Sequence, residues 1–103
     1  QSIAKAAAFL GLGYEALRTV PVDDRFRLRP AELTAQIAAD RRAGWLPLAV
    51  VATVGTTSTG SVDPVAAIAD VCATERLWLH VDASYGGAAA LVPRCAPMFE
   101  GIA

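Results

Sequence analysis

The stretch "LPLAVVATVGTTSTGSVDPVAAIADVCATERLWLHVD" (46–82) decides the fold. It begins with a near-continuous apolar run (46–54) and ends with a second one (76–82). Such runs are typical of strands covered on both faces, as in a parallel sheet. The part between them predicts a helix, with Asp63 as its N-cap and Pro64 at the first helical position. We therefore expect two buried parallel strands that are joined by a helix and lie side by side.

The preceding sequence extends this alternation of helices and strands. The alanine-rich segment "SIAKAAAFLGLG" (2–13) predicts a helix that its glycines end. The segment "EALRTVPV" (15–22) predicts a short strand, and "RPAELTAQIAADRRAG" (29–44) predicts a second helix that starts near Pro30. The order is typical of an α/β layered domain with a mostly parallel sheet and flanking helices.

Composition and charge argue against several classes of function. Apolar residues make up 54% of the 103 residues, and the net charge is −1, so nothing favours nucleic acid or an anionic membrane surface. No apolar run approaches the roughly 20 residues of a membrane span. Cys72 and Cys95 lack metal-ligand spacing, with His80 the only histidine, and they fit free thiols in a reducing cytoplasm. We expect a cytoplasmic protein that binds neither nucleic acid nor membranes.

Ligands of open α/β sheets bind beyond the carboxyl ends of the strands, and two loops follow such ends here. The loop "GTTSTGS" (55–61) carries hydroxyl groups, and its glycines allow a ligand to approach the backbone. It lacks the Gly-Lys-Ser/Thr of a Walker A loop, and an ordinary strand-to-helix connection explains it equally well. We expect Thr57, in this loop, to share one sheet edge with Asp82 of the second loop, "DASYGG" (82–87).

Asp82 is the most informative single residue. Alternation along the second strand puts Trp78, His80 and Asp82 on one face. A carboxylate in such apolar company needs a partner, because an unpaired buried charge is costly. Two interpretations stay open: a turn carboxylate bonded to nearby backbone amides, or a carboxylate that faces a cationic ligand atom. His80 is better interpreted as a packed residue than as a catalyst.

The segments "VVATVGTTSTGSVDPVAAIADVC" (50–72) and "LWLHVDASYGGAAALVP" (77–93) together resemble the pyridoxal-phosphate-dependent group II amino-acid decarboxylases. The aromatic-L-amino-acid decarboxylases are the nearest members by this resemblance, which runs through the chain from "QSIAKAAAFLGLG" (1–13). It implies the fold-type-I, aspartate-aminotransferase-like large domain, of which residues 1–103 would be the central part, incomplete at both ends. It also implies pyridoxal 5'-phosphate as the cofactor.

The resemblance assigns roles to individual residues. Asp82 holds the position of the aspartate that pairs with the pyridine nitrogen of the cofactor and keeps it protonated, which implies a catalytic role as well as cofactor binding. Thr57 matches a cofactor-contacting threonine of the family's "GTT" loop. Ser84 is a candidate cofactor-binding residue where the family usually has alanine, and whether its hydroxyl touches the cofactor stays open. Asp63 matches an acidic position, for which a structural capping role is favoured.

The resemblance further implies decarboxylation of an L-amino acid, with an aromatic one favoured, to the amine and carbon dioxide in a cytoplasmic homodimer. Alternatives are the same cofactor with glutamate, histidine, diaminobutyrate or a sulfinate as substrate, or a non-catalytic α/β binding module. The family's Schiff-base lysine follows an Asn-Pro-His-Lys motif, whereas the only lysine here is Lys5 in the first predicted helix. The ring-stacking histidine and the phosphate-binding residues are also expected outside residues 1–103, so this segment alone should not catalyse.

Overall fold

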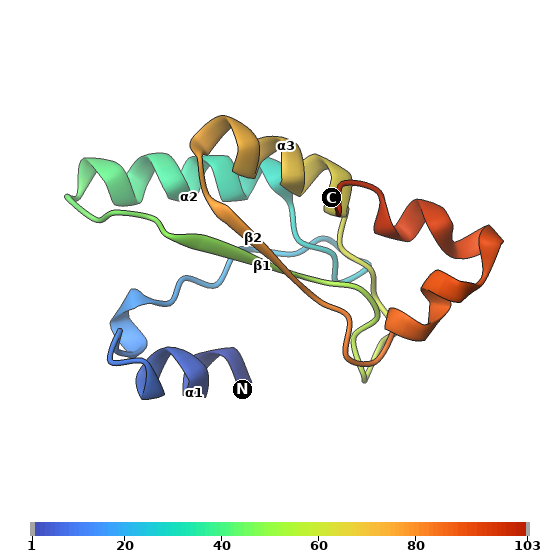
Figure 1. The fold of residues 1–103 in the computed structure, drawn as a ribbon. Helices are drawn as coiled ribbons and strands as arrows, with labels where there is room; N and C mark the ends of the chain where they lie inside the picture. Colours follow the sequence, from blue (N-terminus) through green and yellow to red (C-terminus); the bar gives the residue numbers. More distant parts are fainter. Residues whose placement is uncertain (1, 103) are drawn as a thin grey trace.

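The computed structural model describes residues 2–102, and its centre is a parallel pair of strands (Figure 1). Strand β1 (Ala49–Thr53) and strand β2 (Trp78–Asp82) pair in a register that sets Thr53 opposite Asp82. Helix α3 (Val65–Glu75) connects them. The predicted strand–helix–strand unit is therefore confirmed. Each strand is shorter than the apolar run that predicted it.

Helix α2 (Pro30–Arg42) and α3 cover one face of this sheet (Figure 1). The helix predicted over 29–44 is confirmed, and Gly44 follows its end with a φ of 86°, which a side chain would strain. One hydrophobic core lies between the helices and the sheet. It comprises Leu33, Ile37, Val50, Ala52, Ile68 and Cys72.

The opposite face of the sheet is open within residues 2–102, and here the prediction of burial on both faces is wrong. Strand β2 contains no buried residue, and Trp78 is 71% exposed. Leu77 and Leu79 instead pack against the core on the helix-covered side. The alternation of faces predicted along β2 is thus confirmed, but the described residues supply helices for only one of the two faces.

The strand predicted over 15–22 is also wrong. The chain there forms a short 3-10 helix, η1 (Tyr14–Ala16), followed by extended backbone. Within residues 2–102, the strand-type pairing of this segment is limited to an isolated antiparallel bridge between Val22 and Leu28. Pro21 cannot donate a backbone hydrogen bond, which disfavours a longer strand pairing. Helix α1 (Ser2–Phe9) precedes η1 and stands apart from the sheet (Figure 1).

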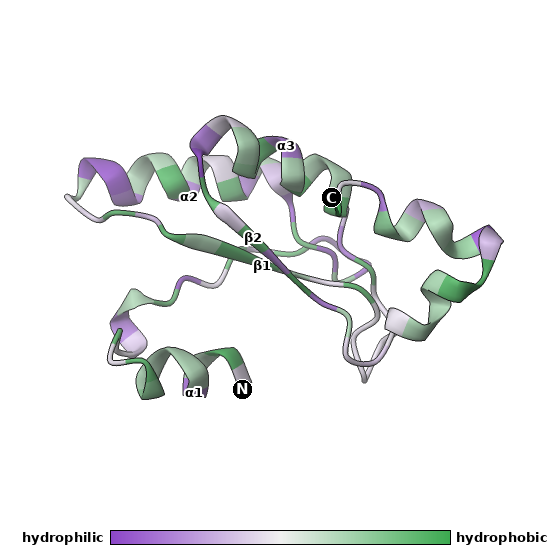
Figure 2. Ribbon diagram, in the orientation of Figure 1, coloured by the Kyte–Doolittle hydropathy of each residue, from purple (hydrophilic) through white to green (hydrophobic). Residues whose placement is uncertain are grey.

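After β2 the chain continues as two 3-10 helices, η2 (Gly87–Leu91) and η3 (Pro93–Phe99), and returns to α3. Gly101 lies so close to that helix that an added Cβ would be 2.9 Å from the Cα of Ala66. Figure 2 shows hydrophobic residues in α1 and after β2 as well as in the sheet–helix layer. Among the residues that the structure describes, no helix combines the length and apolar character needed to cross a membrane.

Candidate active site at the carboxyl ends of the strands

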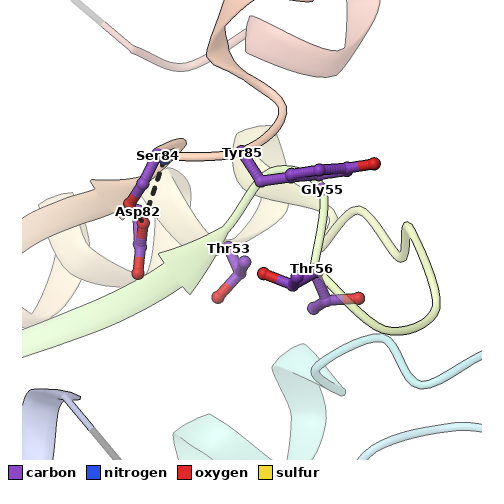
Figure 3. Close-up of a pocket in the computed structure, with 7 residues that line it drawn as sticks. Thr53, Gly55, Thr56, Asp82, Ser84 and Tyr85 are labelled. Atoms are coloured by element: carbon purple, nitrogen blue, oxygen red, sulfur yellow. Dashed lines mark hydrogen bonds between the residues drawn. The ribbon is translucent and has the colours of Figure 1, made fainter.

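A hollow of about 280 Å³ lies where β1 and β2 end (Figure 3). Thr57 and Asp82 both line it, so the prediction that they share one sheet edge is confirmed. Ser84 lines it too, which brings the three predicted site residues together. The remaining lining residues are Thr53, Gly55, Thr56 and Tyr85. Because ligands of open α/β sheets bind at this edge, the hollow is the candidate site.

The Asp82 carboxylate is held from one side only. Its Oδ1 accepts a hydrogen bond from the backbone amide of Ser84 at 3.1 Å and another from the Ser84 hydroxyl. These bonds, the hydroxyl's first, lower the pKa of Asp82, and nearby His80 adds to the effect. The carboxylate is therefore negatively charged at neutral pH. The interpretation of Asp82 as a turn carboxylate bonded to a nearby backbone amide therefore holds for Oδ1. Figure 3 shows that the second oxygen is turned away from Ser84.

Two glycines bring the loops after β1 and β2 into contact. A Cβ on Gly86 would lie 2.2 Å from the carbonyl oxygen of Val54, and one on Gly55 would lie 2.9 Å from the Cα of Gly86. Gly55 also has a φ of 81°, which residues with side chains rarely adopt. Side chains at either position would push the loops apart. The glycines thus set the spacing between Thr57 on one loop and Asp82 on the other.

Most hydroxyl groups of the 55–61 loop are hydrogen-bonded within the protein. The Thr56 and Thr59 hydroxyls lie 2.6 Å apart, and the Ser61 amide donates to the Thr56 oxygen at 3.0 Å. The Ser61 hydroxyl reaches the carbonyl oxygen of Phe26 at 2.9 Å. Within residues 2–102 the hydroxyls of Thr57 and of Thr53, at the end of β1, make no hydrogen bond, so of the hydroxyl groups that this loop contributes to the hollow, that of Thr57 is available to a ligand.

Asp63 does not cap α3, which corrects the N-cap prediction. The helix starts at Val65 after Pro64, without a side-chain cap. The Asp63 carboxylate turns back instead and accepts hydrogen bonds from the amides of Leu28 at 2.6 Å and Thr53 at 2.7 Å. It therefore ties the end of β1 to the segment before α2. No local signal predicts this role, because the partners lie 35 and 10 residues away.

Other candidate groups lie elsewhere. Lys5 belongs to α1 and is not among the residues that line the hollow. Cys72 is a free thiol in the core, and burial raises its pKa, while the free Cys95 is half-buried. Over residues 2–102 no three His, Cys, Asp or Glu side chains gather in a way that could hold a metal ion. The chemistry of the described chain thus concentrates around Asp82.

Comparison with known proteins identifies what the chain resembles. The family described as "Pyridoxal-dependent decarboxylase conserved domain" matches residues 1–103. Cysteine sulfinic acid decarboxylase of Rattus norvegicus is 46% identical over 101 residues, which are 98% of this chain and 20% of that protein. The acidic amino acid decarboxylase GADL1 of Homo sapiens is 45% identical over 98% of this chain and 19% of its own length. The chain thus spans about a fifth of the length of these relatives.

Solved structures share the fold of the described residues. The crystal structure of mouse CSAD superimposes with a TM-score of 0.95 at 46% identity, over 98% of this chain and 22% of that one. The structure of Oryza sativa TDC with PLP and tryptamine superimposes with a TM-score of 0.89 at 41% identity, over 95% of this chain and 20% of that one. The predicted fold class, a fragment of a pyridoxal-phosphate decarboxylase large domain, is therefore confirmed.

Proposed function

Because this chain belongs to the pyridoxal-dependent decarboxylase family, we propose that the complete protein uses pyridoxal 5'-phosphate to remove the α-carboxylate of an L-amino acid as carbon dioxide. Residues 1–103 would form the central part of its large cofactor-binding domain. One observation carries the proposal: an ionised Asp82 lines the same hollow as Thr57, whose hydroxyl has no hydrogen bond within residues 2–102.

The residues around the hollow suit the protonated pyridine ring of pyridoxal phosphate. A protonated ring nitrogen needs an anionic partner, and the pKa of Asp82 is lowered, so its carboxylate supplies that charge at neutral pH. Because Gly55 and Gly86 lack side chains, the backbones of the two loops come into contact there, and this contact sets the distance between the loops. The Thr57 residue, on the other loop, lines the same hollow, and its hydroxyl would bind a polar ring substituent.

The bound cofactor would supply an electron sink for the pair of electrons left when carbon dioxide departs. The described residues would hold and orient it. Asp82 would keep a proton on the ring nitrogen, since its carboxylate favours the charged form of that nitrogen. Thr57 would fix the orientation of the ring in its plane by one hydrogen bond. The lysine that joins the cofactor covalently would come from outside residues 1–103, as Lys5 is not at the hollow.

An acidic L-amino acid, with a sulfinate or carboxylate side chain, is the first candidate substrate. Relatives named for cysteine sulfinic acid and for acidic amino acids are 46% and 45% identical to this chain. An aromatic amino acid, the substrate favoured by the sequence resemblance, is the second candidate. It is supported by the rice structure that contains tryptamine, at 41% identity.

The test is release of carbon dioxide by the complete protein, supplied with pyridoxal phosphate. Cysteine sulfinate, aspartate, glutamate, tryptophan and tyrosine would be assayed separately, with Asp82→Asn as the matched inactive variant. We expect turnover of at least one acidic substrate, lost in the variant. Turnover of tryptophan or tyrosine alone would select the second candidate. Absence of carbon dioxide from every substrate by a cofactor-loaded protein would contradict the proposal.

We also propose that the complete protein is a cytoplasmic homodimer. Free thiols at Cys72 and Cys95 suit a reducing compartment, and a dimer is implied by the family resemblance. Light scattering of the purified complete protein would measure its mass, and imaging of a tagged copy would locate it. A monomer that decarboxylates at full rate, or a secreted protein, would contradict these two points.

A further inference from the structure

Ser84 directs both of its donors at the same oxygen of Asp82. The backbone amide reaches Oδ1 at 3.1 Å, and the hydroxyl also donates to Oδ1. The two contacts span the turn that follows β2, so the side chain of Asp82 is held by the residue two positions later (Figure 3). A carboxylate held by two donors from one residue has little freedom to rotate.

The remaining oxygen of Asp82 is thereby left for a ligand. Within residues 2–102, Oδ2 of Asp82 accepts no hydrogen bond from the protein, and it points away from Ser84 (Figure 3). A serine hydroxyl has a single proton, and that of Ser84 is already donated to Asp82. The hydroxyl can therefore not donate to a cofactor at the same time, although it lines the hollow.

Resting on the proposed function, we infer that Ser84 is a positioning residue that acts on the cofactor through Asp82 rather than by touching it. Its two hydrogen bonds hold Oδ1, so that Oδ2 is presented to the protonated ring nitrogen. The lowered pKa of Asp82, caused chiefly by the Ser84 hydroxyl, agrees with this arrangement because it keeps the carboxylate charged. The effect of Ser84 should then depend on the presence of a ring nitrogen.

That dependence defines the experiment. Dissociation constants of the complete apoprotein would be measured by absorbance titration for pyridoxal phosphate and for its deaza analogue, in which a C–H replaces the ring nitrogen. The variants are Ser84→Ala, Ser84→Thr, which restores a hydroxyl, and Ser58→Ala, which removes an exposed hydroxyl outside the hollow. We expect Ser84→Ala to raise the dissociation constant of pyridoxal phosphate roughly fivefold, as for the loss of one hydrogen bond. The dissociation constant of the analogue should not change. Ser84→Thr and Ser58→Ala should resemble wild type.

The outcomes separate this inference from the proposed function. If Ser84→Ala weakens the binding of both ligands equally, Ser84 has a direct or a general structural role, and the inference is overturned. The inference is also overturned if Ser84→Ala weakens the binding of neither ligand. If the wild-type protein binds the analogue as tightly as pyridoxal phosphate, Asp82 does not pair with the ring nitrogen, and the cofactor site itself is wrong. If wild type discriminates and Ser84→Ala discriminates equally well, only the inference about Ser84 fails.

Discussion

The two faces of the β1–β2 sheet are built from the same ten residues but serve different ends. On one face, Val50 and Ala52 are buried against α2 and α3. On the other, Trp78 and His80 are exposed, and Asp82 meets the hollow. The covered face is complete within the described residues, whereas the open face borders the hollow at which we propose the chemistry. Stability and function can therefore be perturbed separately, because alternate side chains of one strand point to opposite faces.

The largest expected effect is on the open face. Asp82→Asn preserves shape but removes the negative charge, so the ring nitrogen would lose the partner that keeps it protonated. Each pKa unit lost at that nitrogen corresponds to about 1.4 kcal/mol, so the loss of several units would slow decarboxylation by orders of magnitude. Single-turnover decarboxylation at saturating cofactor measures this. Asp70→Asn, on the exposed side of α3, is the matched control. A wild-type rate for Asp82→Asn would show that Asp82 only shapes the turn.

A substitution on the covered face should lower the stability of the fold and leave the rate of decarboxylation unchanged. Ile68 is 0% exposed at the centre of the core. Ile68→Ala should lower the free energy of unfolding by about 2–5 kcal/mol, and Ile68→Val by about 0.5–1.5 kcal/mol. Denaturant unfolding of the complete protein measures both. The turnover per cofactor-loaded molecule should stay near wild type, and a large fall in that rate without a loss of stability would break the distinction between the faces.

Asp63 lies between the two regions and should affect both. An amide at this position can accept only one of the two backbone hydrogen bonds and turns a donor toward the other amide. Asp63→Asn should therefore cost about 1–3 kcal/mol of stability and weaken cofactor binding by loosening the end of β1. Unfolding curves and cofactor titrations would be compared with those of Asp70→Asn. Identical behaviour of the two variants would show that the tie to β1 contributes nothing.

The smallest expected effect is at Thr57. Removing its hydroxyl takes away one hydrogen bond to the cofactor, about 1 kcal/mol, which is roughly a fivefold rise in the cofactor dissociation constant. Ser58→Ala removes a hydroxyl from the same loop outside the hollow and should change nothing. The measurement is again an absorbance titration. Equal affinities for Thr57→Ala and wild type would place the cofactor away from this loop.

Local patterns in the sequence were sufficient for the parts of the molecule in which neighbours along the chain decide the outcome. Apolar runs and a helix between them predicted the parallel pair, and the period of two placed Trp78 and Asp82 on one face. The carboxyl-edge rule for α/β sheets then brought Thr57 and Asp82 together. The role of the site residues as cofactor ligands stays a prediction, derived from the resemblance.

Other features depended on contacts between distant segments, and here only the tertiary structure decided. Which face of the sheet is covered depends on where α2 and α3 pack, and an apolar run alone does not contain that information. The Asp63 carboxylate could cap a helix or bind distant amides, and the amide of Leu28, 35 residues away, settled the choice. The segment 15–22 has strand-forming residues, but among residues 2–102 it pairs only through the isolated bridge between Val22 and Leu28. Periodicity along the chain predicts helices and strands, whereas strand pairing, burial and hydrogen-bond partners depend on which distant segments pack together.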